Sequence, residues 1–128
     1  MFLVDSHCHL DLLDLTPDQG DMNKVIARAQ ANGVHYFLNV CVSLADFPTI
    51  LKTAENYPFV GTSVGLHPNE QEEETDMATL IALGQHQKVV AIGETGLDYF
   101  RSSGDLTWQH ERFRAHIRAA KKLKKPLI

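Results

Sequence analysis

The chain has 128 residues, which suffices for one domain with its own core and not for two. Its composition, 44% hydrophobic and 22% charged, is that of a soluble globular protein, and no apolar run approaches the roughly 20 residues that span a bilayer. A net charge of −4 argues against a surface coated with the positive charge that nucleic acids attract.

The first expected element is a short apolar run, Phe2–Val4, which two histidines follow closely. No basic segment precedes the run, so it does not resemble a signal peptide, and we expect a cytoplasmic protein. If the run continues as a β-strand, His7 and His9 point the same way, because alternate side chains of a strand share a face. Cys8 then points to the opposite side, where we expect a buried apolar residue that is neither a ligand nor disulfide-bonded to Cys41.

Further strand-like runs follow, and helical patterns separate them. The strand-like runs are Val34–Val42, Phe59–Leu66, Val89–Gly93 and a last one that begins at Pro126–Ile128. The expected helices begin at Asp21, at Ser43 or Asp46, at Thr75-Asp76 and at Thr107, where the sequence offers residues that start helices. The first helix should close at Asn32-Gly33 and the second should end before Tyr57-Pro58.

Apolar residues recur at helical spacing, and we expect them to face the core. They are Met22, Val25, Ile26 and Ala29; Phe47, Ile50, Leu51 and Ala54; Met77, Leu80 and Ile81; and Phe113, Ile117 and Ala120.

The last helix carries a concentration of positive charge. Residues 107–125 hold seven of the twelve basic residues and one acid, so this segment carries +6 and the remainder −10. The stretch from Arg112 to Lys125 could attract an anionic polymer, but a solvated outer helix face is the usual explanation and the one we expect. The start of the helix at Thr107 is better placed to receive a phosphate.

The order of elements, a strand and a helix repeated four times before a fifth strand begins, predicts an α/β protein with a parallel sheet. An open doubly wound sheet is complete at four or five strands, but no glycine-rich phosphate loop follows the first run. A (β/α)8 TIM barrel takes about 250 residues, so residues 1–128 would be its first half, without an internal domain boundary. A natural protein seldom ends in an opening strand, because the edge is left unprotected, and this favours the half barrel.

Ligands bind at the carboxyl ends of the strands in either architecture, so the polar residues there are the candidates for chemistry. His7 and His9 are predicted to bind a metal, since imidazole is a common ligand of divalent cations. Glu94 follows the run Val89–Gly93 and offers a carboxylate that can bridge two cations. The alternative is that Glu94 is a loop or helix-capping acid.

Other polar residues at the strand ends have two roles open to them. His67, just before Pro68, is a candidate proton donor or phosphate contact, with a structural loop role as the alternative. Asp11 and Asp98 could support the ligands from behind, although fixing its own loop is the favoured role for Asp98. The four remaining histidines, His35, His86, His110 and His116, are expected at the surface or in packing.

Three segments at the strand ends carry motifs that belong together. They are residues 2–11 (FLVDSHCHLD), 64–68 (VGLHP) and 92–99 (IGETGLDY). In order and approximate spacing they resemble the TatD family of metal-dependent deoxyribonucleases. Residues 93–99 are the most specific part, whereas a histidine pair alone also occurs in other amidohydrolase-like enzymes. The closing residues 125–128 resemble the family's entry into its fifth strand.

The resemblance implies a (β/α)8 barrel about twice this length, with one or two divalent cations (Mg, Mn, Zn, Co or Fe) at the strand ends. The residues that match His7, His9 and Glu94 are then metal ligands, and Glu94 bridges when two ions are bound. His67 matches an active-site histidine near the scissile phosphate. The substrate is DNA or another nucleic acid, hydrolysed through attack of a metal-bound water. The family's other ligands, two histidines and an aspartate, come from later strands.

Several hypotheses follow from this resemblance. The first is a deoxyribonuclease in which residues 1–128 alone are an incomplete fragment without activity. The second keeps the metal site but assigns it to a D-aminoacyl-tRNA deacylase or another amidohydrolase-type hydrolase, since the acidic remainder does not favour a large nucleic-acid footprint. The third is a truncated barrel that binds without turnover, closed by dimerisation if it is self-sufficient. No membrane contact and no obligatory protein partner are predicted.

Overall fold

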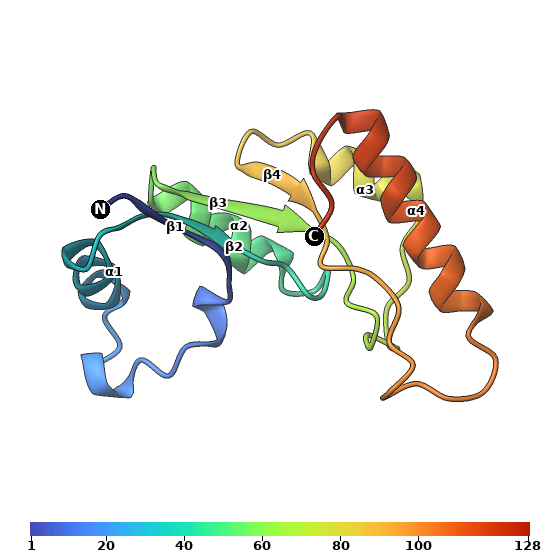
Figure 1. Cartoon of the computed structure of the whole chain (residues 1–128), viewed down its shortest axis with the longest axis horizontal. Coiled ribbons are helices and arrows are strands. Elements are labelled where there is room, and N and C mark those ends of the chain that lie inside the picture. The colour runs from blue at the N-terminus through green and yellow to red at the C-terminus, as the bar shows by residue number, and fades with distance from the viewer.

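The computed structural model describes residues 1–128, and its centre is a parallel sheet. The strands are β1 (Leu3–Cys8), β2 (Val34–Asn39), β3 (Val60–Val64) and β4 (Val89–Ile92). They lie in the order β1-β2-β3-β4, so that each strand is hydrogen bonded to the next one along the chain. Figure 1 shows the sheet between α1 at one end of the molecule and α3 and α4 at the other.

A helix follows each strand, as the sequence predicts. The helices are α1 (Met22–Ala31), α2 (Phe47–Asn56), α3 (Met77–Gly84) and α4 (Thr107–Leu123), and two short 3-10 helices, η1 (Leu10–Leu12) and η2 (Thr16–Asp18), precede α1. None of the helices combines the length and the apolar character that crossing a membrane requires. The cytoplasmic location stays a prediction.

The helix starts are partly those expected. The Asp21 carboxylate accepts a hydrogen bond from the Asn23 backbone N–H at 2.9 Å, and the Asp76 carboxylate accepts one from Thr79 N–H at 2.8 Å. These are ordinary N-terminal caps. Asp46 occupies the corresponding position of α2, but its carboxylate accepts from the Ser43 hydroxyl at 2.6 Å instead of from a helical N–H. Ser43 and Asp46, the two alternative starting residues of this helix, therefore hydrogen bond to each other in front of it.

The strand order decides between the two architectures. A doubly wound sheet reverses its order at a switch point, whereas this sheet runs in sequence without reversal. Right-handed crossovers then place all helices on the same side, as in half of a (β/α)8 barrel. The predicted fifth strand also begins where expected: Leu127 pairs in parallel with Ile92, whose N–H donates to Pro126 O at 2.9 Å.

Two apolar clusters fill the space between the sheet and the helices. The larger consists of Cys41, Phe47, Ile50, Val64, Leu80, Val89, Ile92, Ala119 and Ala120, and the smaller, next to α1, of Leu10, Ile26, Phe37, Ala54 and Val60. Most of the predicted core positions therefore face inward. Met77 does not: its side chain is 41% exposed because it is the first residue of α3, at the edge of the packed layer.

The buried side of α4 differs from the prediction. Phe113 and Ile117 are only half-buried, whereas Gln109, Arg112 and His116 are at most 3% exposed. The expectation of a solvated basic face is thus wrong for Arg112 and for Lys125, whose Nζ donates to the carbonyl groups of Gly84 and Val89. It holds for the exposed Arg114, Arg118, Lys121 and Lys122. Buried polar side chains must be hydrogen bonded. The partners of these three residues lie next to the candidate site.

Candidate metal centre

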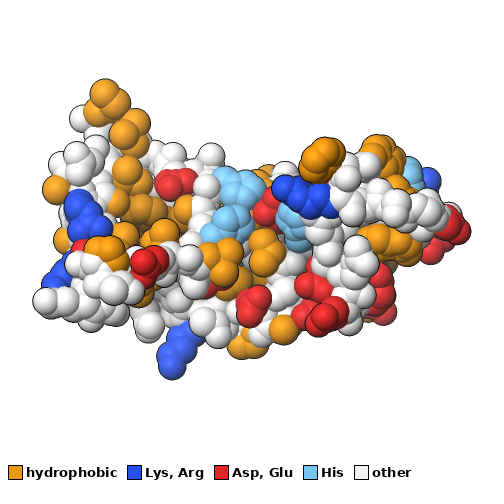
Figure 2. Space-filling view, turned by 90° about the horizontal axis from the view of Figure 1, so that it is seen from below, with side chains coloured by type: hydrophobic (Ala, Val, Ile, Leu, Met, Phe, Trp, Pro, Cys, Tyr) orange, Lys and Arg blue, Asp and Glu red, His pale blue; other side chains and the backbone are white.

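The predicted site residues meet at the carboxyl ends of three strands. His7 lies in β1, His9 directly follows it, His67 follows β3 and Glu94 follows β4. Figure 2 shows pale-blue histidine side chains close together near the middle of one face, with red Asp and Glu side chains beside them. All four side chains are partly open to solvent, with 24 to 44% of each exposed.

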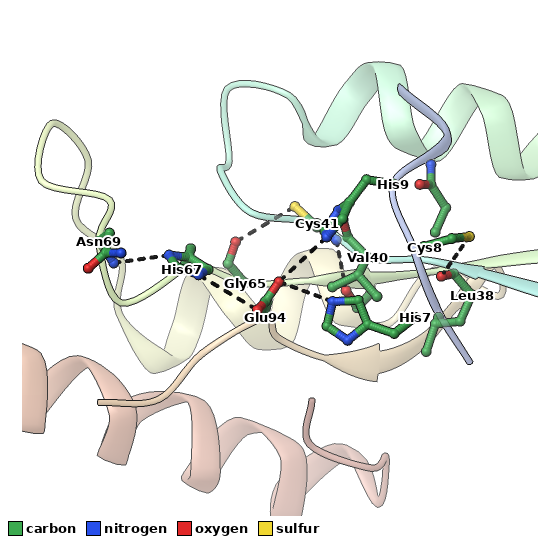
Figure 3. A network of polar contacts seen from close by, with 12 residues as sticks. His7, Cys8, His9, Leu38, Val40, Cys41, Gly65, His67, Asn69 and Glu94 are labelled. Carbon is green, nitrogen blue, oxygen red and sulfur yellow. Dashed lines mark hydrogen bonds and ion pairs between the residues drawn. The ribbon is translucent and has the colours of Figure 1, made fainter. Parts of the chain in front are cut away.

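Glu94 is the centre of this group. Its Oε2 lies 3.3 Å from His7 Nε2 and 3.8 Å from His9 Nε2, while its Oε1 lies 3.6 Å from His67 Nε2. The ligand atoms of His7, His9 and Glu94 all lie within 4.8 Å of one another. Figure 3 shows the Glu94 carboxylate between His67 on one side and the histidine pair on the other. The structure therefore brings together the four residues that the strand-end argument selected.

The backbone fixes the tautomer of the neutral His9 ring. His9 Nδ1 lies 2.9 Å from the carbonyl oxygen of Val40, and a carbonyl can only accept. Nδ1 therefore carries a proton, and in the neutral ring Nε2 turns a lone pair toward Glu94. Metal-binding histidines are commonly held in this way, with the second ring nitrogen donating to a backbone carbonyl.

His67 is held in the opposite tautomer. Its Nδ1 accepts a hydrogen bond from the backbone N–H of Asn69 at 3.1 Å, so in the neutral ring the proton lies on Nε2. That N–H faces Oε1 of Glu94. The carboxylate consequently has a lone-pair donor on one side and a hydrogen-bond donor on the other.

Three successive carbonyl groups after β2 hold three of these residues. We call this segment, Val40–Val42, the β2 extension. Val40 O accepts from the His9 ring, Cys41 O accepts from the backbone N–H of Glu94 at 2.7 Å, and Val42 O accepts from that of His67 at 2.9 Å. The predicted strand Val34–Val42 is cut short at Asn39 for this reason, because the carbonyl groups beyond it bond to the site.

Two glycines allow β3 and β4 to approach each other closely at their ends. A Cβ atom on Gly65 would lie 2.6 Å from the Cα atom of Gly93, and one on Gly93 would collide with the Ile128 carbonyl. Gly93 also has φ = 138°, a conformation that favours glycine. Because neither residue has a side chain, His67 and Glu94 can lie on neighbouring strand ends within 3.6 Å of each other.

The α4 helix holds the segment Leu66–Pro68 through consecutive backbone groups. His116 Nε2 accepts from Leu66 N–H at 3.0 Å, Arg112 donates to His67 O at 3.2 Å, and Gln109 Nε2 donates to Pro68 O at 3.1 Å. The side-chain oxygen of Gln109 also accepts from Asp98 N–H at 2.8 Å, which joins the loops that follow β3 and β4. We call Gln109, Arg112 and His116 the α4 clamp.

The α4 clamp is the part of the site that sequence reasoning missed. His116 takes the packing role that the sequence analysis left open for it: it is fully buried, and burial lowers its pKa so that the ring stays neutral and accepts from Leu66. What was not foreseen is its hydrogen bond to the segment that carries His67. His116 Nδ1 donates to Arg112 O at 2.8 Å. The three residues are spaced by three and four, so they share one helix face, and this spacing was the available signal.

The remaining candidates lie outside the group around Glu94. Asp98 fixes its own loop, because its Oδ1 accepts from the backbone N–H groups of Phe100 and Arg101, each at 2.9 Å. The Oδ1 atom of Asp11 is buried without a hydrogen-bond partner, and the supporting role of this residue stays a prediction. Cys8 points away from Glu94 in Figure 3. Burial raises the pKa of its thiol to about 12, with smaller contributions from Asp5 and Asp11.

Cys8 is only partly buried, whereas the sequence predicted a buried residue, and Cys41 is buried. Cys8 and Cys41 are free thiols. Burial raises the pKa of Cys41 to about 11, so neither residue offers a thiolate at neutral pH.

The loop role of Asp98 makes a prediction about pH. Hydrogen bonds, first from the Arg101 backbone and then from the Asn69 side chain, lower the pKa of Asp98 from 3.8 to about 2. Since the folded state favours the ionised form, its contribution to stability is fully present above pH 3.8 and is lost as the pH falls toward 2. We expect Asp98→Asn to lower the urea midpoint at pH 7, and the difference from the unmodified protein to shrink across this window. A difference that is constant with pH would contradict the proposed cause.

The donor set around Glu94 fits a divalent cation. His9 Nε2 and Glu94 Oε2 are both electron-pair donors, and they lie 3.8 Å apart. The lone pairs of these two atoms repel each other, whereas a cation held by both would bind to each of them. The separations of 3.3 and 3.8 Å bracket the distance of about 3.4 Å between two ligand atoms in a tetrahedral shell of radius about 2.1 Å. Two imidazoles and a carboxylate suit Zn, Mn, Co or Fe, and Mg where water completes the shell.

Comparison with known proteins identifies related sequences. The profile of the family described as TatD related DNase matches residues 4–128. An uncharacterized metal-dependent hydrolase of Buchnera aphidicola subsp. Baizongia pistaciae is 39% identical over 100% of this chain and 49% of its own length. The uncharacterized metal-dependent hydrolase YcfH of Escherichia coli K12 is also 39% identical, over 48% of its length. The 3'-5' ssDNA/RNA exonuclease TatD of Citrobacter rodentium is 34% identical over 84% of this chain and 42% of its length.

A solved structure agrees with the fold. The crystal structure of YjjV, a TatD homolog from Escherichia coli K12, matches 97% of this chain with a TM-score of 0.77 and 28% identity. The match covers 48% of that protein. The chain thus spans about half the length of the curated relatives and of the solved structure that it matches.

Proposed function

The chain belongs to the TatD related DNase family, and from this premise we propose that the protein is a metal-dependent hydrolase that cleaves phosphodiester bonds of DNA. The observation that carries the proposal is the arrangement on either side of Glu94. A lone pair of His9 and a proton of His67 face the two oxygens of one carboxylate, fixed there by backbone groups. The lone pair would help to hold a cation that offsets negative charge on the phosphate, and the proton would be donated to a phosphate oxygen. Both effects promote the hydrolysis of a phosphodiester.

The relatives support the same class of reaction. Two of them are named metal-dependent hydrolases, and a third is named a 3'-5' ssDNA/RNA exonuclease. The choice of DNA as the substrate is supported by the name of that third relative alone. The acidic charge outside residues 107–125, −10 in total, suits a short contact with nucleic acid better than a long one.

His7, His9 and Glu94 would hold the cation. When bound, a divalent cation acts as a Lewis acid that polarises phosphoryl oxygens and lowers the pKa of water. The residues prepare its place: the Val40 carbonyl fixes the His9 ring, and the Cys41 carbonyl fixes the backbone from which Glu94 extends. The two oxygens of Glu94 face different neighbours, so Oε1 is left for a second cation or for contact with His67.

His67 would act on the substrate through its Nε2 proton. Because Asn69 N–H occupies Nδ1, the outward nitrogen donates in the neutral ring as well as in the charged one. In the neutral ring it can therefore hydrogen bond to a phosphate oxygen, and as the charged imidazolium it can protonate the leaving oxygen. The α4 clamp keeps the backbone of His67 in place while this happens.

The proposal is tested with the protein in its full natural length. We expect it to remove nucleotides from a labelled single-stranded DNA after chelation and reloading with Mg, Mn or Zn, and to be inactive in chelator. His67→Gln should lower kcat by about 100- to 10,000-fold, the usual contribution of a positioned acid or base, with metal affinity retained. His35→Gln is the matched control, since its ring stacks on Phe2 at 5.1 Å, away from the strand ends that carry the site.

The same assay separates the competing substrate. A D-aminoacyl-tRNA is offered under identical conditions, and release of the amino acid is compared with cleavage of DNA. Turnover of the ester without cleavage of DNA would reject the nuclease and keep the metal-dependent hydrolase. A full rate of DNA cleavage by the His67→Gln protein would reject the role given to the Nε2 proton.

A further inference from the structure

A buried amide next to the metal centre has no part in the function proposed above. Asn39 is the last residue of β2, and its side chain is fully buried. Its Oδ1 accepts a hydrogen bond from the backbone N–H of Leu10 at 2.8 Å, whereas its Nδ2 is buried without a partner. An apolar side chain of the same shape would only exchange one unpaired buried donor, Nδ2, for another, the Leu10 N–H. The amide thus adds little to the stability of the fold, which points to a local role.

The contact that Asn39 makes holds the backbone that carries His9. The Leu10 N–H belongs to the peptide group that follows His9. The peptide group before His9 is held as well, because its carbonyl, that of Cys8, accepts from the Val40 N–H at 2.8 Å. The His9 ring itself donates to the Val40 carbonyl at 2.9 Å. The ring and both neighbouring peptide groups are therefore bonded to two consecutive residues at the end of β2.

Regular strand pairing does not fix this part of the chain. β1 lies at one end of the sheet, and its pairing with β2 is irregular between Asp5 and Cys8, directly before His9. After Cys8 the chain leaves the strand and turns into η1, and the first N–H groups of a helix have no acceptor within it. Oδ1 of Asn39 provides the acceptor for Leu10. A side chain of β2 thus sets the place at which the chain turns away from β1.

We propose that Asn39 is a positioning residue of the metal centre, which holds His9 Nε2 at the distance from Glu94 Oε2 that a shared cation needs. The inference rests on the metal centre of the proposed function and adds a residue that does not touch the cation itself. The two ligand atoms already lie 3.8 Å apart. A ligand that is held in place before the cation arrives loses less conformational freedom on binding, so the affinity is higher.

Asn39→Leu tests this role, because leucine has the branched shape of asparagine but cannot accept from the Leu10 N–H. The full-length protein is stripped of metal with a chelator and titrated with zinc by calorimetry. We expect the Kd for zinc to rise about tenfold, the lower end of the loss that follows removal of a group supporting a metal ligand. The urea midpoint of the metal-free protein should change little, since one unpaired buried donor replaces another.

Thr62→Val is the matched control, with the opposite expectation. Thr62 is also fully buried, pairs with Asn39 across the sheet, and donates through its hydroxyl to the Asn39 carbonyl at 2.9 Å. Valine removes this hydrogen bond but leaves the side chain of Asn39 and its contact with Leu10 in place. We expect a lower urea midpoint and an unchanged affinity for zinc. The two variants therefore separate support of the sheet from support of His9.

Two results would overturn the role given to Asn39. One is an affinity of Asn39→Leu for zinc equal to that of the unmodified protein. The other is an equal loss of affinity in Thr62→Val, because any loosening of β2 would then have the same effect. If Asn39→Leu does not fold, Asn39→Ala takes its place in both comparisons. Alanine removes the amide without placing an apolar group against the Leu10 N–H, and the same loss of affinity is expected.

The failure of this inference can be told apart from the failure of the proposed function, because zinc binding is measured without DNA. A protein that binds zinc but cleaves no DNA would reject the nuclease, and the affinities of the variants would still decide the role of Asn39. Cleavage of DNA by a protein whose affinity for zinc does not depend on Asn39 would reject the positioning role and leave the nuclease standing.

Discussion

Replacing Glu94 with Gln is expected to abolish metal binding and to lower DNA cleavage by more than about 100-fold, the upper end of the loss seen when only a supporting residue of a metal site is removed. The amide keeps the size of the side chain but offers one neutral oxygen in place of a carboxylate. His7 and His9 alone then provide two neutral ligands, too few to hold a divalent cation firmly.

The metal-free stability of this variant provides the sharper test. Without a cation, the lone pair of neutral His9 opposes the charge of Glu94, whereas the His67 proton faces an oxygen that the Gln side chain also offers, so the substitution should leave the melting temperature unchanged or raise it. The unmodified protein should gain about 2.7 kcal/mol at a metal concentration 100 times Kd, and Glu94→Gln should gain nothing. Glu55→Gln is the matched control, because Glu55 also lies 3.3 Å from a histidine, His86, but without a second histidine in the group. An equal metal-induced shift in both variants would contradict the assignment of Glu94.

The sequence is a good guide to the side chains of the centre because strand geometry places them. His7 and His9 share a face of β1 by alternation, and parallel strands end at one edge, so His67 and Glu94 had to lie near them. Sequential order of the strands then follows from the short crossovers. These arguments need only local periodicity and the rule that ligands gather at carboxyl ends.

The backbone contacts of the metal centre cannot be predicted from the sequence. The β2 extension reads as more strand, because Val40, Cys41 and Val42 are apolar, yet its carbonyl groups hold His9, Glu94 and His67. Carbonyl groups leave no mark on the sequence. The tautomers of His9 and His67, and with them the division into a ligand and a proton donor, therefore emerge only from the fold.

The error at Arg112 has a different cause. A basic residue in a basic run is normally solvated, and composition gives no warning that one member of the run is buried. Arg112 donates to the carbonyl groups of His67, Glu70 and Glu73 at 2.5 to 3.2 Å and to the Glu74 carboxylate at 2.6 Å. A guanidinium can satisfy several acceptors at once because its donors form a rigid fork. The loop after β3, which lacks secondary structure between β3 and α3, depends on this fork for its shape.

Arg112→Met is therefore expected to destabilise the fold by about 3–5 kcal/mol, the loss typical of removing one partner from a buried, hydrogen-bonded charge. Chemical denaturation measures this loss. Arg114→Met on the same helix is the matched control, since Arg114 is exposed and should change stability by no more than about 0.5 kcal/mol. Arg112→Lys keeps the charge without the fork and should recover only part of the loss.

The effect on function separates a clamp from a general support. Arg112 bonds to His67 and to its loop, not to His7, His9 or Glu94. Under conditions where Arg112→Lys remains folded, its metal affinity should equal that of the unmodified protein, whereas kcat should fall because the Nε2 proton of His67 is no longer held in place. A loss of metal affinity as large as the loss of kcat would show that α4 supports the whole centre instead of one histidine. A stability equal to that of Arg114→Met would show that the loop keeps its shape without the clamp.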